Sequence, residues 1–202
     1  MFSRINYSLF IIALLLVIGC NGQPTPVVAA SGNTVVASPR NDIAGLSNFA
    51  WASQSVCRGA QPDAQGFKEL KKIGIKTIIN LRSMHSDNDM MKGLGLQYCA
   101  IPSVAHHSEE EDVIAFLKVA TNPAHQPVFV HCQHGSDRTG LMLAIYRIYV
   151  QNWSKEDALK ELEVFGRHDI YSNIPKFIKA FDVEKMKAKL AAASEPKVEV
   201  IE

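Results

Sequence analysis

The sequence predicts a single α/β domain in which helices flank a central, mostly parallel sheet. Short apolar and β-branched runs, such as residues 76–81 and 128–131, alternate along the 202-residue chain with longer segments whose apolar residues recur at helical spacing. This alternation is typical of parallel sheets, because a helix returns the chain to the start of the next strand. Hydrophobic residues make up 47% of the chain and charged residues 20%, a balance that supports a packed core.

Turn and capping residues set the boundaries of these elements. Gly74 closes the first helix and Pro102 stops the strand that begins near residue 96. Ser108 and Ser154 each precede an acidic turn, as residues that cap a helix do. We expect strands within 46–60 and at 76–81, 96–101 and 128–131, and helices at 62–72, 108–119, 139–150, 154–166 and 175–190.

The first twenty residues resemble a bacterial lipoprotein signal. The apolar run Leu9–Ile18 has about half the length that a helix needs to span a bilayer. It leads into Gly19-Cys20, where a small residue precedes a cysteine, so residues 1–19 are predicted to be a signal peptide and Cys20 the lipidated residue. The alternative is an ordinary signal peptide with an incidental cysteine. Asn21 is not Asp, which among lipoproteins favours the outer membrane over the inner one.

The rest of the chain divides into three predicted parts. Residues 20–45 are rich in small and polar residues and are predicted to be a flexible tether, 46–190 the folded domain and 191–202 a disordered tail. These features predict a monomer in the bacterial cell envelope, lipid-anchored and facing the periplasm. The net charge of +1 provides no overall basic field, so a nucleic-acid partner is not expected and an anion site must be local.

Three cysteines remain beyond Cys20, an odd number for an oxidising compartment. At least one of them must be unpaired, and a nucleophile is one reason to keep a free thiol. Pairing of Cys57 with Cys99 stays open on the sequence alone.

The segment Pro127–Tyr146 contains the chemistry. A strand ends at Cys132, a loop containing Gly135 follows, and Arg138 begins an apolar helix. The first amides of a helix have no partner within it, so a strand–loop–helix junction of this kind binds anions. Arg138 adds a planar fork that can hold two phosphate oxygens, and the same positive field favours the thiolate form of Cys132. The segment therefore predicts a nucleophilic thiolate beside a phosphate site.

Each residue of this loop has a predicted role. Cys132 attacks the phosphorus to give a phosphocysteine, which water then hydrolyses. Thr139 is placed to stabilise the departing thiolate, and His131 to orient the loop through buried hydrogen bonds. The predicted substrate-binding residues are Gln133, His134, Gly135, Ser136, Asp137 and Arg138.

The run from His131 to Gly140, HCxxGxxRTG, resembles the signature of the protein tyrosine phosphatase superfamily, and the dual-specificity branch is nearest. Exported bacterial phosphatases of this branch share HCxHGxxRTG and the following YRxxVQxW pattern, which spans Tyr146–Trp153 here. Arg58–Pro62 and the strand TIINLR are also similar, so the resemblance covers about residues 50–185. It implies a dual-specificity phosphatase-like fold. Phosphoproteins, phosphotyrosine proteins first, or small phosphomonoesters would be the substrates, and no metal or cofactor would be needed.

The general acid departs from this resemblance. The superfamily uses an Asp from a loop that precedes the cysteine, and the matching stretch here has no Asp before Asp112. Alignment on Pro102 and Cys132 places His106 nearest that position, and a histidine can donate a proton near neutral pH. His106 is therefore the first candidate for the acid. His107, Glu109 and Glu110 are the alternatives, along with water.

Other readings of these residues stay open. Cys132 could be a buried structural thiol, and His131, Cys132 and His134 could ligate a metal. Arg58 could line the pocket, but an arginine near the start of a domain is expected to form a surface ion pair. Asp87 and Asp89 could supply a remote acid, but both are expected to lie in a solvated loop. Asp137 could position water, contact substrate or cap the helix.

Two further functions compete with a protein phosphatase. One is an inositol phosphate or phosphoinositide phosphatase, because several lipid phosphatases have an Asp before the loop Arg, as Asp137 is here. The absence of Lys and Arg at positions 133, 134 and 136 argues against it. The other is a catalytically weak phosphate-binding protein of the envelope.

Overall fold

The computed structural model describes residues 36–202, and it confirms a single α/β domain. The signal peptide, Cys20 and most of the predicted tether lie outside the described residues. Six strands form one sheet in the order β1-β2-β5-β3-β4-β6. The four central strands are parallel, and β1 and β6 pair antiparallel at the two edges, so the sheet is mixed. The strands are β1 (Ala50–Trp51), β2 (Val56–Gly59), β3 (Thr77–Arg82), β4 (Leu96–Ser103), β5 (Val128–His131) and β6 (Glu199–Ile201).

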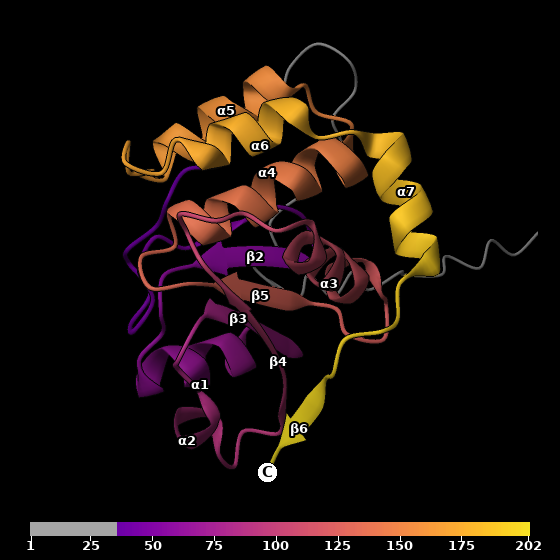
Figure 1. The fold of residues 1–202 in the computed structure, drawn as a ribbon. Coiled ribbons are helices and arrows are strands. Elements are labelled where there is room, and N and C mark those ends of the chain that lie inside the picture. The colour runs from indigo at the N-terminus through magenta and orange to yellow at the C-terminus, as the bar shows by residue number, and fades with distance from the viewer. Residues whose placement is uncertain (1–35) are drawn as a thin grey trace, which may run out of the picture.

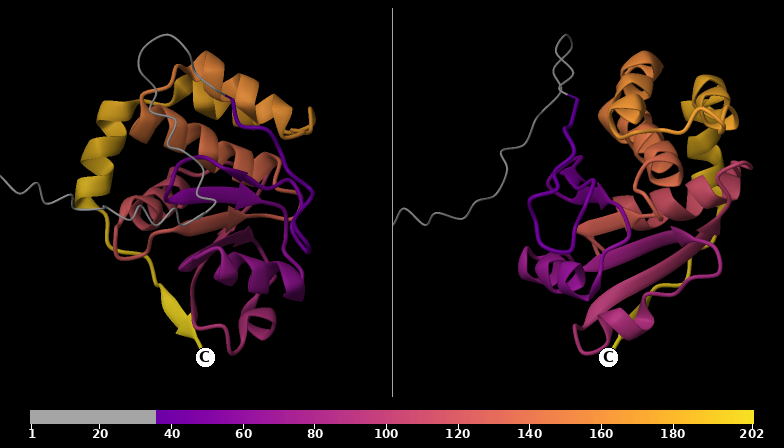
Figure 2. Two further views of the ribbon diagram at one scale, coloured as in Figure 1. Left: turned by 180° about the vertical axis from the view of Figure 1, so that it is seen from behind. Right: turned by 90° about the vertical axis from the view of Figure 1, so that its left-hand side faces the viewer.

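Helices cover both faces of this sheet (Figure 1). One face carries α1 and α2; α3 and α4 pack on the other, with α5 and α6 forming an outer layer over α4 (Figures 1 and 2). The helices are α1 (Ala64–Lys72), α2 (Asn88–Met91), α3 (Glu110–Thr121), α4 (Asp137–Gln151), α5 (Lys155–Val164), α6 (Asn173–Ala180) and α7 (Val183–Ala192). Within the described chain, no helix is long and apolar enough to cross a membrane.

Alternating strand residues divide the core into two clusters. Ile79 and Val130 pack with α3 and α4, whereas Ile78 and Phe129, one residue away, pack with α1. The same alternation settles the open question about the cysteines. Cys57 and Cys99 are both buried free thiols, and they belong to opposite clusters on strands separated by β5 and β3. A disulfide between them is therefore excluded by distance and direction.

Close packing of α4 against α5 fixes the helix that follows the signature loop. A Cβ at Gly140 would lie 2.3 Å from the Leu162 side chain, so only glycine allows this approach. The buried Arg147 guanidinium donates two bonds to Glu161 on α5, at 3.1 and 2.9 Å, and lies over the Trp153 ring. The YRxxVQxW pattern is thus a structural anchor for α4.

Three expectations about the chain ends were wrong. The tail predicted to be disordered contains β6, which pairs with Leu96–Tyr98 and places Ile201 against the core. The last predicted helix is two helices, because buried Phe181 leaves the helical conformation and Asp182 caps α7. The domain also begins before residue 46, since Arg40 forms a bridge with Phe49 and Ile43 packs on the core.

The remaining element boundaries differ little from expectation. Ser154 caps α5 by accepting a bond from the Asp157 amide, as predicted. Ser108 does not cap α3; Glu109 occupies the cap position and the Ser108 hydroxyl instead accepts a bond from Asn173. The strand β4 continues through Pro102 to Ser103.

Candidate active site

The signature loop lies between the end of β5 and the start of α4, as predicted. Cys132 directly follows β5 and is 2% exposed, and α4 begins at Asp137 with Ser136 before it. Gly135 has φ of 73°, and a Cβ there would lie 2.6 Å from the backbone of Gly59 and Ala60. A glycine is therefore required for the loop to turn against β2. The junction presents the free amides of a helix N-terminus next to the thiol.

Arg138 is fixed by carbonyls at the ends of two strands. Its Nη1 donates to Leu81 O at 3.2 Å and to Ser103 O at 3.3 Å. Within residues 36–202 the Nε and Nη2 edge has no hydrogen-bond acceptor, which leaves it for two oxygens of one phosphate.

Thr139 lies under the loop and is fully buried. Its hydroxyl has no hydrogen-bond partner in the described part of the chain. A buried hydroxyl without a partner is costly, so it indicates a group that acts in a later state of the site. Donation to the Cys132 sulfur as it leaves phosphorus, the role predicted from the sequence, would satisfy it.

Arg58 is a buried cation beneath the loop, not the surface ion pair that was expected. It is 1% exposed, donates from Nη2 to Gly135 O at 2.5 Å and lies 3.6 Å from the centre of the Phe165 ring. Burial lowers its pKa to about 10, with the charges of Glu161 and Cys132 acting in the opposite direction. Arg58 therefore stays charged at neutral pH and places a fixed positive charge beneath the signature loop.

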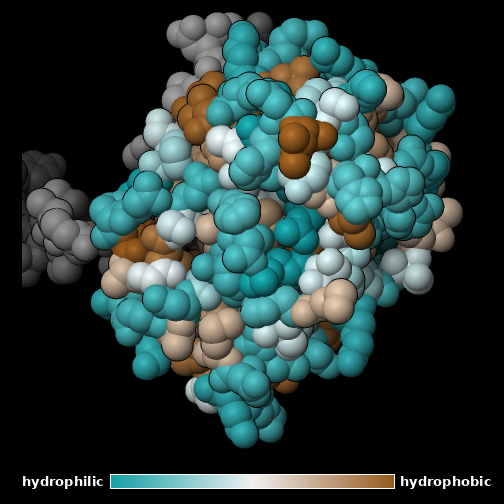
Figure 3. Space-filling view, turned by 60° about the vertical axis from the view of Figure 1, so that its left-hand side comes forward, coloured by the Kyte–Doolittle hydropathy of each residue, from teal (hydrophilic) through white to brown (hydrophobic). Residues whose placement is uncertain are grey.

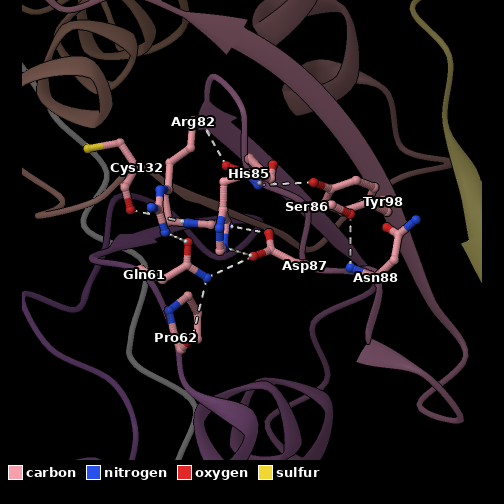
Figure 4. A network of polar contacts seen from close by, with 11 residues as sticks. Gln61, Pro62, Arg82, His85, Ser86, Asp87, Asn88, Tyr98 and Cys132 are labelled. Atoms are coloured by element: carbon pink, nitrogen blue, oxygen red, sulfur yellow. Dashed lines mark hydrogen bonds and ion pairs between the residues drawn. The ribbon is translucent and has the colours of Figure 1, made fainter. Parts of the chain in front are cut away.

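His131 orients the loop through a buried contact with Asp87, which continues to Gln61 and Arg82 (Figure 4 shows the last three). Its Nε2 lies 2.9 Å from Asp87 Oδ2, and the other Asp87 oxygen accepts from Gln61 Nε2 at 2.7 Å. Gln61 Oε1 in turn accepts from Arg82 Nη1 at 2.9 Å. The prediction for His131 is confirmed, whereas the prediction that Asp87 is solvated was wrong, because this carboxylate is fully buried.

The charge on Asp87 is maintained by these donors. Burial alone would raise the pKa of Asp87, but hydrogen bonds from His131 and Gln61 and the charges of His131 and His85 hold it below its ordinary value. The ionised carboxylate ties the start of the signature loop to the end of β3. Sequence reasoning missed this connection, because Asp87 and His131 lie far apart in the chain.

The loop forms the floor of a pocket of about 340 Å³. Gln133, His134, Asp137 and Arg138 line it as predicted, whereas Gly135 and Ser136 are buried behind it. The face toward which the parallel strands run is mostly hydrophilic, with a strongly hydrophilic hollow near its centre (Figure 3). Residues that sequence reasoning missed complete the lining: Arg82, Ser83, Ala105, His168, Ile170 and Tyr171.

The structure does not bring His106 to this pocket. Val104 O accepts from the amide of His107 in a tight turn, and Ala105 is the residue of the turn that faces the pocket. The His106 side chain is exposed. His107 is also exposed and pairs with Glu109 at 3.5 Å, and Glu110 pairs with Lys189 on α7. None of the predicted acids lines the Cys132 pocket.

Asp137 has a partner that the sequence did not suggest. One carboxylate oxygen accepts from the His168 amide at 2.8 Å and the other lies 2.7 Å from His168 Nδ1. His168 lies in the loop between α5 and α6 and reaches the pocket from the far side of α4. In residues 36–202 no group of three or more His, Cys, Asp or Glu side chains is arranged to hold a metal ion.

The junction combines a strand that ends in a buried thiol, a turn that requires glycine and an arginine with one free edge. These three features define the loop of cysteine-dependent phosphatases. The model of the tyrosine phosphatase family matches residues 44–198. The chain therefore belongs to the tyrosine phosphatase family, and the resemblance inferred from the signature is confirmed.

Individual relatives agree with this assignment. The dual specificity protein phosphatase TpbA of Pseudomonas aeruginosa is 29% identical over 142 residues, which cover 69% of this chain and 65% of that relative's length. The inositol diphosphatase DSP5 of Arabidopsis thaliana is 25% identical over 150 residues, with 69% and 72% covered.

Solved structures confirm the dual-specificity phosphatase-like fold. The crystal structure of Pseudomonas aeruginosa TpbA matches with a TM-score of 0.65 and 28% identity, covering 77% of this chain and 96% of that one. A variant of TpbA in complex with phosphotyrosine matches with the same TM-score and 26% identity, covering 78% of this chain and 96% of that one.

Proposed function

We propose that this chain is a protein tyrosine or dual-specificity phosphatase that hydrolyses phosphate monoesters through a phosphocysteine. One observation carries the proposal: Cys132 and Arg138 line a single pocket at the N-terminus of α4. The Arg138 fork and the first amides of α4 would bind the phosphate and place its phosphorus over the thiolate. Arg58 below the loop supports that thiolate with a fixed positive charge.

The reaction runs in two displacements. The Cys132 thiolate forms a bond to phosphorus as the phosphorus–oxygen ester bond breaks, and the departing oxygen takes a proton. Water then attacks the phosphocysteine and gives up its proton, while the sulfur–phosphorus bond breaks and its electron pair returns to sulfur. Thr139 donates a hydrogen bond to that sulfur as it leaves.

The wall of the pocket suits an aryl phosphate. Tyr171 lines the pocket, and beside it Ile170 is an apolar side chain that is 80% exposed. An aromatic leaving group would pack on these two residues while its phosphate reaches the loop. The relative TpbA has been crystallised in complex with phosphotyrosine, which supports phosphotyrosine proteins as first-choice substrates.

The predicted N-terminal features place this activity at the cell envelope. Residues 1–19 would act as a signal peptide, and lipidation of Cys20 would anchor a periplasm-facing domain in the outer membrane. A Cys20→Ser variant is expected to leave the membrane fraction for the soluble periplasm. Retention of that variant in the membrane would contradict the anchor.

Turnover of a phosphotyrosine peptide by wild type and Cys132→Ser tests the activity. Wild type should release phosphate, and the variant should not release it above background. Rapid quenching of wild type should trap phosphate on Cys132. Equal, near-zero rates for both proteins would instead leave a catalytically weak phosphate-binding protein.

An inositol phosphate or diphosphate is a second candidate substrate. Arg82 lines the pocket opposite the signature loop and provides a second cation for a further phosphate group, and relatives such as DSP5 are named inositol diphosphatases. If this substrate is the right one, Arg82→Ala should lower turnover of inositol phosphates far more than turnover of phosphotyrosine peptides. Equal losses on both substrates would favour the peptide.

A further inference from the structure

The pocket lacks the proton donor that the sequence led us to expect. Ala105 occupies the place in the turn after β4 that faces the pocket, and it has no titratable group. Asp112 lines a separate, smaller cavity behind Arg138, among Leu141, Met142 and other residues, and not the Cys132 pocket. A donor must therefore come from another element that lines the Cys132 pocket.

We propose that His168, held by Asp137, is the general acid and base of the reaction. This inference rests on the proposed function, and it assigns the proton-transfer role at that site to a loop outside the signature. His168 lines the pocket together with Cys132 and Arg138, and its side chain is 49% exposed. A leaving group bound over Cys132 could therefore reach it.

The hydrogen bonds around His168 fix which nitrogen acts. Nδ1 lies 2.7 Å from Asp137 Oδ2, so it donates to the carboxylate and Nε2 is the nitrogen left for substrate. Asp137 is nearly buried and its other oxygen already accepts from the His168 amide. A carboxylate held in this way orients the ring, with Nε2 left free for substrate.

The loop that bears His168 is anchored on both sides of this residue. Arg167 donates to Glu163 on α5 at 2.7 Å, to the His168 carbonyl at 3.2 Å and to Asp169 at 2.8 Å. The Arg167 side chain is only 11% exposed. A proton donor must be held in place to act in the transition state, and these bonds supply that rigidity.

Several charged and titratable groups surround the imidazole. Asp137 lies beside it from α4, and Arg167 and Asp169 flank it in its own loop. The His134 ring of the signature loop is 5.7 Å away and the Tyr171 ring 6.3 Å away, centre to centre. The remaining charged groups of the same pocket are Cys132, Arg138 and Arg82.

The proton balance closes over the two displacements. As the Cys132–phosphorus bond forms and the ester bond breaks, Nε2 of the imidazolium gives its proton to the departing oxygen, which leaves as an alcohol or phenol. The neutral imidazole then takes a proton from the attacking water as orthophosphate leaves and the thiolate returns. The imidazolium is thereby restored for the next turnover.

The experiment compares phenyl phosphate, a poor leaving group, with 2,4-dinitrophenyl phosphate, which needs no proton. In His168→Asn the side-chain amide can still donate to Asp137 from the place of Nδ1, but it cannot give a proton to the leaving group. We expect kcat/KM for phenyl phosphate to fall about 10²-fold, with the dinitrophenyl ester nearly unchanged. His125→Asn, the same change at the opposite end of the sheet, should behave as wild type on both esters.

Equal losses on the two esters would show that His168 only holds its loop, and would overturn the proposal. Unchanged rates on both would overturn it as well. The proposed function fails separately, and the inference with it, if wild type and Cys132→Ser hydrolyse the dinitrophenyl ester equally slowly.

A second variant tests the orienting carboxylate and covers the case in which His168→Asn does not fold. Asp137→Asn keeps the size of the side chain but removes the carboxylate that accepts from Nδ1 and leaves Nε2 for substrate. The loss in kcat/KM should be larger for phenyl phosphate than for the dinitrophenyl ester, a difference that a purely structural contact would not produce. Equal losses on the two esters would contradict the role of Asp137.

Discussion

The loop after β5 and the loop after β4 reach the same pocket, but the rest of the chain holds them very differently. The signature loop is buried on its inner side and tied to Arg58, to Asp87 through His131, and to α5 through Gly140. The turn at 104–107 exposes Val104, His106 and His107, and it is held by a backbone bond between Val104 and His107 and a bond from Asn173 Nδ2 to Ala105 O at 3.0 Å. The proposed phosphate site is thus built into the core, whereas the turn where the family places its acid is a surface feature.

This difference indicates which catalytic group can be supplied by a different loop. The thiolate and the phosphate clamp require the buried junction of β5 and α4, which no other part of the described chain repeats. A proton donor requires only a titratable group that reaches the leaving oxygen. The Asp137–His168 pair shows how a third loop, at 165–172, could supply it.

Replacement of the phosphate clamp should have the largest effect. Arg138→Lys keeps the charge but loses the planar fork whose Nη1 bonds Leu81 O and Ser103 O. We expect kcat/KM to fall about 10³-fold on every ester, because the fork acts on the phosphate and not on the leaving group. Steady-state kinetics on both aryl phosphates measures this. A loss confined to phenyl phosphate would contradict a clamp common to all substrates.

The buried network below the loop should affect folding more than chemistry. Asp87→Ala leaves the buried donor His131 Nε2 without its acceptor and removes the shorter of two bonds from Gln61 Nε2, which also donates to Pro62 O at 3.3 Å. We expect the free energy of unfolding to fall by about 3 kcal/mol. Urea unfolding measures this change. Asp89→Ala, the same substitution two residues away at an exposed site, should change stability little, and a comparable loss there would contradict the network.

The geometry of the signature loop was predictable because neighbouring residues encode it. Cys132, Gly135 and Arg138 are close in sequence, and their spacing with the flanking strand and helix determines the geometry. The hydrogen bonds that hold the signature loop from below were not predictable, because they join residues far apart in the chain. Asp87 lies in a polar loop that was predicted to be solvated, but its side chain is buried. That burial depends on hydrogen-bond donors from two other segments of the chain.

The prediction placed the general acid at His106, one residue away from Ala105, which is the residue that faces the pocket. The reason for this error is physical. Alignment on Pro102 assumed that the strand stops there, whereas β4 continues to Ser103 and then turns, so that Ala105 faces inward. Side-chain direction in a turn depends on single-residue register, which spacing alone does not determine. The tail offered a usable signal: Val198, Val200 and Ile201 are β-branched residues, which are enriched in strands such as β6.

Adding a carboxyl group to the turn after β4 should give that turn the proton-donating role that we assign to His168. Ala105 faces the pocket, so Ala105→Asp would place an acid on the side opposite His168. We expect kcat/KM for phenyl phosphate to rise about 10-fold in the His168→Asn background, and less in wild type. Ala105→Asn, of the same shape without the proton, is the control. A gain with Asn as large as with Asp would show that shape, not proton transfer, is responsible.

The smallest expected effect concerns Asp112 in the first turn of α3. Burial, and next the charges of Glu109 and Glu111, raises the pKa of Asp112 from 3.8 to about 6. A raised pKa means that the folded state binds the proton more tightly than the unfolded chain, so stability falls as pH rises through this window. Asp112→Asn removes that cost and should stabilise the protein by about 1 kcal/mol at pH 7.5, after allowance for its partial exposure.

Urea unfolding of wild type and Asp112→Asn across pH 4 to 8 checks this expectation. The difference between the two proteins should shrink as the pH falls from about 6 to about 4, because the carboxyl is protonated first in the folded state and then in the unfolded chain. Glu111→Gln, at an exposed position in the same turn, should show a smaller change. Unchanged kcat/KM in Asp112→Asn would separate this group from proton transfer. A stability difference that does not vary with pH would instead assign the effect to packing of the amide, because ionisation of a buried carboxyl cannot act in a pH-independent way.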